Sequence, residues 1–378
     1  MNDQKFFLVN RVLIPLIIVS LLLLTSTVRA DSQSSLDLAT AIERTLLQSP
    51  RLQQFPYQQR ALEAQRLQAG LPPNPQIQAD VENVFGTGES RVLSGAEFTL
   101  SLSQLIEMGD KRLKRVDLVD AKSSQIQQDF ERQRLDTLSD VTMKFLQGLR
   151  IDALLNWNQQ RIQIEQQALH VINQRAAAGA VGQADVLRMQ LLVERSKARQ
   201  QQLSGERQLA YQQLAASWGE EVDFASLEGQ LQQLPTLPKR EMLEQAISKS
   251  PTYLQSHALI RLREAQLRLS EAQSKADISF GAGIRRLEAQ NDNALVFSFS
   301  MPLQLYDRNQ GNIAAAHADY EAGMLQQQLT QTELRMALLE IYQAMLNNHQ
   351  QNDWLQQTLI PLTQKLMHKS KHSAWNVN

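Results

Sequence analysis

Few side chains of this sequence have the spacing that metal binding requires. The 378-residue chain holds six histidines, and only His368 and His372 lie four residues apart, as two ligands on one helix face would. No acidic residue near this pair offers a third ligand, and the ten methionines form no close pairs suited to a soft metal. We therefore predict no metal site and no bound cofactor.

Catalytic motifs are missing from the sequence as well. The absence of cysteine excludes a thiolate nucleophile and a disulfide scaffold, and there is no phosphate-binding loop, nucleophile elbow or helical metalloprotease pair. With 38 basic and 39 acidic residues, the formal net charge of −1 excludes nucleic-acid binding through bulk basic charge. We predict that the protein is not an enzyme and does not bind nucleic acid. One charged group is interpreted as a solvated cluster between a strand and a helix: Glu107, Asp110, Lys111 and Arg112.

Residues 1–30 have the layout of a signal peptide. Lys5 and Arg11 flank the start of an apolar run over 12–24, and Val28-Arg29-Ala30 offers a small-residue cleavage site. The alternative is a membrane anchor, but thirteen residues span about 20 Å as a helix, against about 30 Å of hydrocarbon. We expect cleavage and export from the cytosol.

The remaining chain contains one structural unit twice. The units begin near Ile42 and Leu243, and in both the apolar residues stand at matching distances before a Ser-Pro pair. We assign the first repeat to residues 31–230 and the second to 240–378. The connector, 231–239, carries two prolines.

Each repeat contains two short segments in which apolar and polar residues alternate. This period of two predicts strands with one apolar and one polar face. Turn residues at 85–90 and 289–293 join them into two hairpins. The alternatives are a small sheet packed on a helix and part of a membrane β-barrel, whose strands need about 9–11 residues. The predicted strands are 76–82, 97–103, 277–284 and 295–301.

Four strands are too few to close a membrane barrel, since the smallest known have about eight. An open edge in lipid would leave backbone groups unpaired, at several kcal/mol each. If the strands enter a membrane, several chains must therefore share one barrel. Gly281 and Gly283, inside a predicted strand, indicate a bend or tight packing. Tyr306 lies beside a strand and is interpreted as a marker of the membrane boundary.

Long uninterrupted segments predict unusually long helices. Residues 111–177 contain no proline and one glycine, which gives a single helix of about 100 Å. Residues 38–71 and 183–217 are each about half as long, so two half-length helices stacked end to end would match the long one. The alternative is an ordinary antiparallel coiled coil. Trp157 and Trp218 are interpreted as helix-packing anchors.

A glycine-containing turn separates the long helix from the returning one. Gly179 and Gly182 permit left-handed backbone angles and close approach by another chain. Asp185 could accept hydrogen bonds from free amides at the start of the returning helix, although Gln183 or Gly182 could be the formal cap. The segment suits a docking point for a partner and, equally, a plain helical-hairpin turn.

Several motifs make the sequence similar to TolC-like outer membrane efflux proteins, in the branch that accompanies heavy-metal (cobalt–zinc–cadmium type) efflux pumps. The similarity runs through almost all of the chain after residue 30. The matching segments are Leu71-Pro-Pro-Asn-Pro-Gln-Ile77, Leu102-Ser-Gln-Leu-Ile-Glu-Met-Gly-Asp-Lys-Arg112, Asp292-Asn-Ala-Leu-Val-Phe297 and Met301-Pro-Leu-Gln-Leu-Tyr-Asp-Arg-Asn-Gln-Gly-Asn-Ile313, with Arg175, Gly179 and Asp185-Val186 at the turn.

This resemblance implies a mostly α-helical homotrimer in which each chain gives two β-hairpins to a shared 12-stranded barrel. The barrel would lie in outer membrane lipid and continue as an α-helical barrel through the periplasm. The protein would be a passive exit duct for heavy-metal cations or other small solutes, driven by an inner-membrane RND pump through a periplasmic adaptor. By resemblance, Arg175 and Asp185 would shape the tip, and the adaptor would contact Gly179, Ala180, Val181 and Gly182. The alternative is a periplasmic coiled-coil adaptor or scaffold without membrane strands.

One departure from the family pattern concerns the second repeat. Its long helix begins near Asn312, and 67 residues would bring it to about Asn378, with no second glycine tip and no returning helix. Residues 367–378 do not resemble the family. We expect a truncated or frame-shifted product that assembles poorly.

Overall fold

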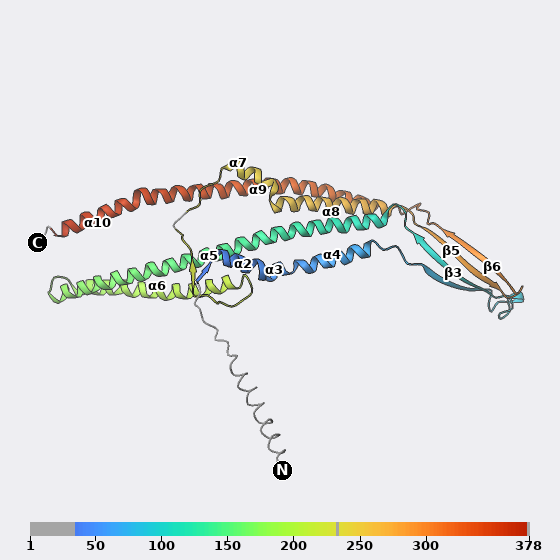
Figure 1. The fold of residues 1–378 in the computed structure, drawn as a ribbon, viewed down its shortest axis with the longest axis horizontal. Coiled ribbons are helices and arrows are strands. Elements are labelled where there is room, and N and C mark those ends of the chain that lie inside the picture. Colours follow the sequence, from blue (N-terminus) through green and yellow to red (C-terminus); the bar gives the residue numbers. More distant parts are fainter. Residues whose placement is uncertain (1–34, 232–233, 376–378) are drawn as a thin grey trace, which may run out of the picture.

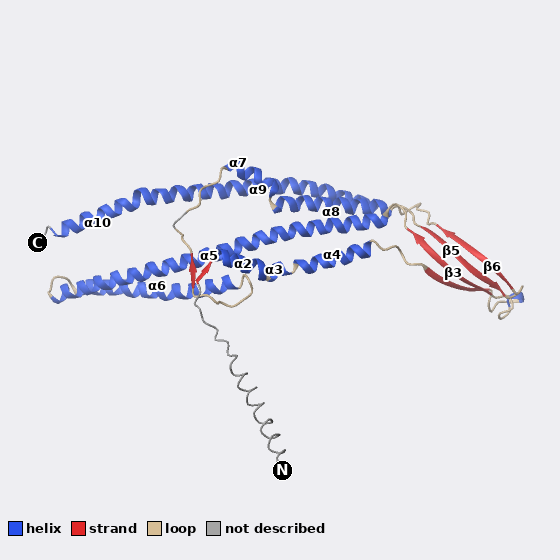
Figure 2. Cartoon of the chain, in the orientation of Figure 1, coloured by secondary structure: helices blue, strands red, loops and turns tan. Residues whose placement is uncertain are grey.

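The computed structural model describes residues 35–231 and 234–375, and the predicted signal peptide, 1–30, lies outside these ranges. The described chain is a long bundle of helices with a small sheet at one end and a helical turn at the other (Figure 1). Figure 2 shows that strands are confined to the sheet and to one short pair near the middle of the bundle. The predicted class, mostly helical with a small β part, is confirmed.

The predicted long helix is confirmed: α5 covers Lys111–Ala177, and α6 returns over Gln183–Ala215. The single helix predicted over 38–71 is wrong, because the chain is broken before Pro50 and again near Pro56, where proline lacks an amide to continue the ladder. Three helices result: α2 (Leu38–Gln48), α3 (Pro50–Gln53) and α4 (Phe55–Ala69).

The second predicted repeat contains the helices α7 (Arg240–Ala246), α8 (Pro251–Gln273), α9 (Gln310–Trp354) and α10 (Ile360–Trp375). The last two form its long helical stretch. One π-helical turn, Leu355–Leu359, joins α9 to α10 just before Pro361, whose ring and missing amide disturb the α-helical ladder. Among the described residues, none of the helices has a stretch that is long and apolar enough to cross a bilayer.

The long helix α5 carries two shorter helices end to end, as predicted. α4 packs on the half of α5 nearer the sheet and α6 on the half nearer the turn (Figure 1). Buried residues of α6 recur at the seven-residue spacing of a coiled coil, at Val186 and Val193 and again at Ser196, Leu203 and Ala210. α8 packs between α5 and α9.

All four predicted strands are present, in one antiparallel sheet of order β2-β3-β5-β6. Three of the strands differ from the prediction in their boundaries. β3 and β5 each extend farther at their C-terminal ends, and β6 begins at residue 292, inside the predicted loop 289–293. The strands are β2 (Gln76–Glu82), β3 (Glu97–Ile106), β5 (Ile278–Leu287) and β6 (Asp292–Ser300).

A second, parallel pair of strands was not foreseen. β1 (Ser35–Asp37) pairs with β4 (Ser226–Glu228) beside the middle of α5. The largest buried cluster lies here and includes Phe145, Leu214 and Trp218. Trp218 is 1% exposed, which confirms it as a packing anchor. The same prediction is wrong for Trp157 within the chain, because its side chain is 56% exposed and lies under the Arg161 guanidinium.

A hydrogen-bonded network fixes the segment before β4 to both long helices. The Arg207 guanidinium donates to Asp152 at 2.7 Å and to the Ala225 carbonyl at 2.6 Å. The Tyr211 hydroxyl donates to Asp152 at 2.7 Å and accepts from Arg207 at 3.1 Å. Burial, and then the bond to the Asp152 carboxylate, raise the pKa of Tyr211 to about 12.

We expect Tyr211 to titrate near pH 12 and Asp152→Asn to lower that pKa. Because the folded-state pKa lies above the unfolded value of 10.0, the neutral phenol stabilises the fold below about pH 10, and this contribution is lost as the pH rises through about 12. The measurement is the ultraviolet titration difference between the wild type and Tyr211→Phe. Titration of Tyr211 near pH 10 in the folded protein would contradict the network.

Candidate functional site: an amphipathic sheet and a helical tip

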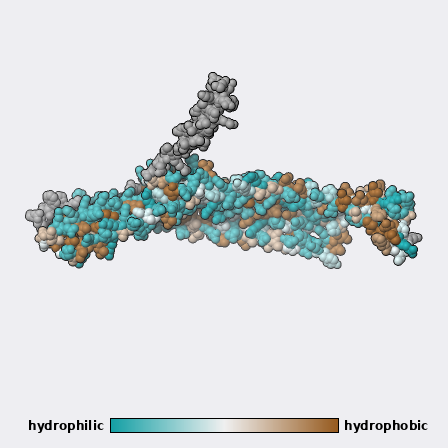
Figure 3. Space-filling model, turned by 90° about the horizontal axis from the view of Figure 1, so that it is seen from below, coloured by the Kyte–Doolittle hydropathy of each residue, from teal (hydrophilic) through white to brown (hydrophobic). Residues whose placement is uncertain are grey.

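One face of the four-stranded sheet is apolar and open. The register places Ile77, Leu102 and Ala282 side by side across three strands, followed by Phe297 on β6. The large side chains of this face are 39–77% exposed in the single chain. The face comprises Ile77, Val81, Phe98, Leu100, Leu102, Phe280, Ile284, Leu295, Phe297 and Phe299. Figure 3 shows hydrophobic side chains gathered at the sheet end, while the helical body is largely hydrophilic.

The opposite face of the sheet is polar. Gln78, Ser101 and Gly283 stand opposite one another, and Ser103 stands between Gln76 and Gly281. The two glycines are tightly packed: a Cβ atom at Gly281 would lie 2.3 Å from the Ser298 Oγ, and one at Gly283 would lie 2.6 Å from the Leu100 carbonyl oxygen. This outcome confirms tight packing rather than a bend. The sheet therefore separates an apolar surface from a polar one.

Both edges of this sheet are open within the described chain. β2 and β6 are the outer strands, and each pairs with a neighbour on one side only. The hydrogen-bonding groups that point outward from these strands are available to strands of another chain. The arrangement can therefore extend sideways through backbone pairing alone.

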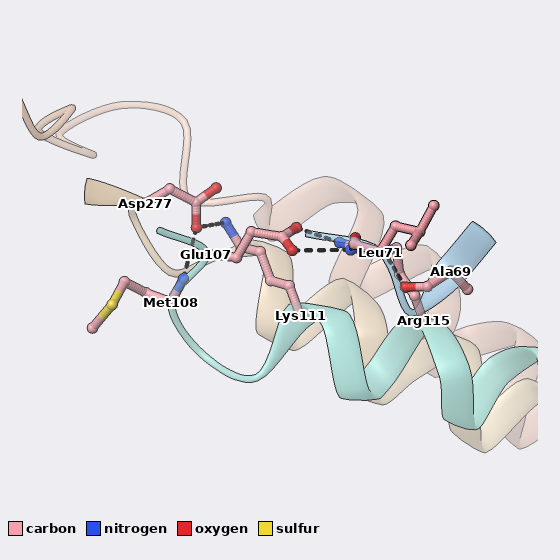
Figure 4. Close-up of polar contacts among 7 residues, drawn as sticks. All are labelled: Ala69, Leu71, Glu107, Met108, Lys111, Arg115 and Asp277. Carbon is pink, nitrogen blue, oxygen red and sulfur yellow. Dashed lines mark hydrogen bonds and ion pairs between the residues drawn. The ribbon is translucent and has the colours of Figure 1, made fainter. Parts of the chain in front are cut away.

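A pair of ionic contacts fixes the sheet to the helices (Figure 4). The Asp277 carboxylate, just before β5, accepts from the Lys111 Nζ at 2.7 Å and from the Met108 backbone amide at 2.9 Å. The two charged side chains are only 12% and 24% exposed. This contact joins the hairpin of β5 and β6 to the first turn of α5.

Arg115 makes the second contact of this junction. Its guanidinium donates twice to the Glu107 carboxylate and also to the carbonyl oxygens of Ala69 and Leu71. The bonds to Glu107 raise the pKa of Arg115 above its ordinary value. The prediction of a solvated charge cluster is thus wrong for Glu107 and Lys111. Sequence reasoning missed Asp277, because it is 166 residues from Lys111 and leaves no local pattern. It also missed Arg115, which is eight residues from Glu107 but meets it across the junction between β3 and α5.

The tip is a helix C-terminus closed by glycine. The Gly179 amide donates to the Ala176 carbonyl at 3.0 Å, and the Ala180 amide donates to the Arg175 carbonyl at 2.9 Å. This bond pair defines a Schellman motif, which requires a left-handed residue, and Gly179 has φ +71°. Gly179, which the sequence indicated, therefore allows the left-handed backbone conformation that ends α5.

On the returning side of the tip, Gly182 is the N-cap of α6, which is one of the two residues that the sequence left open for this position. No side chain makes a capping hydrogen bond at this N-cap. The Asp185 carboxylate instead pairs with Arg188 at 3.0 Å. Ala180 is exposed and Val181 half-buried, so the end of the hairpin presents small, uncharged groups to its surroundings.

The histidines do not gather into a site in the described ranges. No group of three or more histidine, aspartate or glutamate side chains there lies close enough together to hold a metal ion. His368 is exposed on α10, and the His372 side chain lies outside what the structure describes.

Comparison with known proteins supports the similarity predicted from the motifs. The sequence profile of the outer membrane efflux protein family matches residues 41–220. The cobalt-zinc-cadmium resistance protein CzcC of Cupriavidus metallidurans is 26% identical over 251 residues, which are 66% of this chain and 58% of that protein. The chain thus spans somewhat more than half the length of this relative.

Solved structures show the same fold. The chain matches CusC, whose crystal structures describe folding and transmembrane channel formation, with a TM-score of 0.69 at 14% identity, over 89% of this chain and 81% of that one. It matches the outer membrane protein VceC of Vibrio cholerae with a TM-score of 0.69 at 16% identity, over 90% and 86% of the two chains. The chain therefore shares the fold of these two solved structures.

We expect Gly179→Ala to loosen the tip. A Cβ atom at Gly179 meets nothing within 4 Å, so the cost is conformational, about 1 kcal/mol for a left-handed residue. Hydrogen exchange of the amides that close the tip should accelerate about five-fold. Gly182→Ala is the matched control, because Gly182 has φ −83° and tolerates a side chain. Equal exchange rates in the two variants would contradict this role.

Proposed function

We propose that this chain is the outer membrane channel subunit of a tripartite efflux system, acting as a passive exit duct and not as an enzyme. The observation that carries the proposal is the amphipathic sheet with two open edges. Its apolar face contacts lipid and its polar face lines a water-filled lumen, as in membrane β-barrels. Solutes move through this lumen while an inner-membrane pump supplies the energy.

We propose a homotrimer, because four strands with open edges cannot be stable in lipid alone. Each unpaired backbone group in hydrocarbon costs several kcal/mol. Three copies of the sheet give the 12 strands of a closed barrel, with β6 of one subunit pairing with β2 of the next. We take the two units of the chain to be repeats, each of which supplies one hairpin and one long helix.

The helical body would then stand in the periplasm, with the tip farthest from the outer membrane. Its position and its small, uncharged residues suit close packing against an adaptor protein that links the channel to an RND pump. We assign this contact to Gly179, Ala180, Val181 and Gly182, with Arg175 and Asp185 shaping the tip. The similarity to a cobalt–zinc–cadmium resistance protein supports heavy-metal cations as the exported solutes.

The scaffold alternative is not favoured. It requires a sheet packed against helices, whereas ten large apolar side chains of this sheet face away from the chain and are at least 39% exposed. A water-soluble scaffold would expose this patch at a cost of about 25 cal/mol per Å² of apolar surface. Contact with lipid removes that cost.

Membrane fractionation and cross-linking test the proposed function directly. Although we expect the chain to assemble poorly, the fraction that assembles should appear in the detergent-extracted outer membrane, cross-link as a trimer and conduct ions in planar bilayers. Recovery as a monomer in the soluble periplasmic fraction, without conductance, would refute the channel and favour the scaffold.

Substitutions at two neighbouring residues of β6 should show which face of the sheet contacts lipid. Phe297→Arg places a charge on the lipid face, where it costs about 2–4 kcal/mol per chain, so the outer membrane fraction should fall sharply. Ser298→Arg places the same charge on the polar face and should leave membrane insertion near the wild-type level. The fraction of protein in the outer membrane is the measurement. Equal losses for both variants would show that the apolar face does not contact lipid.

A further inference from the structure

Arg285 is the only basic residue on the polar face of the four described strands. The register places four carboxylates on that face, those of Asp80, Glu82, Glu97 and Asp292, with no lysine or second arginine. By their register, all of them lie in the half of the sheet nearer the turns that join β2 to β3 and β5 to β6. The polar face is therefore acidic at its far end and contains a single compensating charge.

Arg285 links three strands through its guanidinium. Nε donates to the Thr99 hydroxyl at 3.0 Å and one terminal nitrogen donates to Glu97 at 2.9 Å. The other terminal nitrogen lies 3.3 Å from the Glu82 carboxylate. Glu82 is on β2, Glu97 and Thr99 are on β3, and Arg285 is on β5, so one side chain offsets carboxylates from two strands.

The other two carboxylates have neutral partners. The Gln78 amide donates to Asp80 at 3.0 Å, and the Asn293 backbone amide donates to Asp292 at 2.7 Å. Neither bond adds a positive charge. Arg285 therefore controls half of the negative charge on this face, and its removal would leave Glu82 and Glu97 uncompensated.

We propose that Arg285 sets the charge selectivity of the pore at its outer end. This inference rests on the proposed channel function. In a closed trimer, three copies of the Glu82–Arg285–Glu97 contact would form one ring around the lumen. Rings of charged side chains decide which ions a pore admits, so a partly neutralised acidic ring favours cations moderately.

The reversal potential across a planar bilayer, under a salt gradient, measures this selectivity. Arg285→Gln should raise the cation-to-anion permeability ratio at least about two-fold, because it frees two carboxylates per subunit. The rise should shrink at high salt, where charges are screened beyond about 3 Å. Arg285→Lys should keep a ratio near the wild-type value, because it retains the charge.

Arg286→Gln is the matched control for the loss of one arginine. Arg286 is the next residue of β5 but lies on the opposite face, where it contacts Glu288 and Asn291. Its substitution should leave the permeability ratio unchanged. Glu97→Gln should move the ratio the other way, toward anions.

The possible outcomes distinguish a failure of the Arg285 inference from a failure of the proposed channel function. A conducting Arg285→Gln channel with wild-type selectivity would overturn the role of Arg285 and leave the channel intact. Equal effects of Arg285→Gln and Arg285→Lys would also overturn it, because they would show a structural role rather than one of charge. If the wild type forms no conducting channel, the proposed function fails, and this inference with it.

Discussion

A sheet with one apolar face and two open edges is the constraint on which this structure depends. Within one chain, the side chains of that face have no partner and the outer strands have unpaired backbone groups on one side. In the proposed channel, lipid contacts this face and strands of sister chains pair with the two edges. Four strands alone would leave the edges unpaired in lipid, so the proposed membrane location requires sister chains because of backbone hydrogen bonding.

The helices connect the sheet to the tip at the other end of the molecule. α5 starts at the sheet, where Lys111 and Arg115 bind Asp277 and Glu107, and runs to the tip without interruption. In the proposed barrel, the position of the sheet therefore determines the position of the tip, because one continuous helix connects them. The buried cluster around Trp218 and the short β1–β4 pair hold the shorter helices to α5 at its middle.

The features visible in the sequence were those with a local signal. Alternation predicted both hairpins, and the absence of proline predicted α5, because period and helix breaking act within a few residues. Gly179 was found for the same reason, since a left-handed residue that closes a helix is nearly always glycine. Strand ends were misplaced at β6, where Asp292 and Asn293 read as turn residues but are held in register by β5.

The features that sequence reasoning missed depend on contacts between distant segments. β1 and β4 have three residues each, too few for any periodicity, and they form only because α2 and α6 bring them together. The Asp277–Lys111 pair joins segments of the two predicted repeats. The burial of Trp157 was misjudged, because a tryptophan on a long helix gives no sign of which neighbour covers it. Such positions are decided by tertiary packing.

The surface of the chain extends the same argument to the helical body. Of the 45 residues of α9, the buried ones are Ala316 and Gly323, while Leu325, Leu329 and Met336 are largely exposed. Apolar side chains spaced along so long a helix need a neighbouring helix, because water would be a costly partner. In the proposed channel, a ring of identical subunits would supply neighbours both for the sheet and for the exposed apolar side chains of the helices.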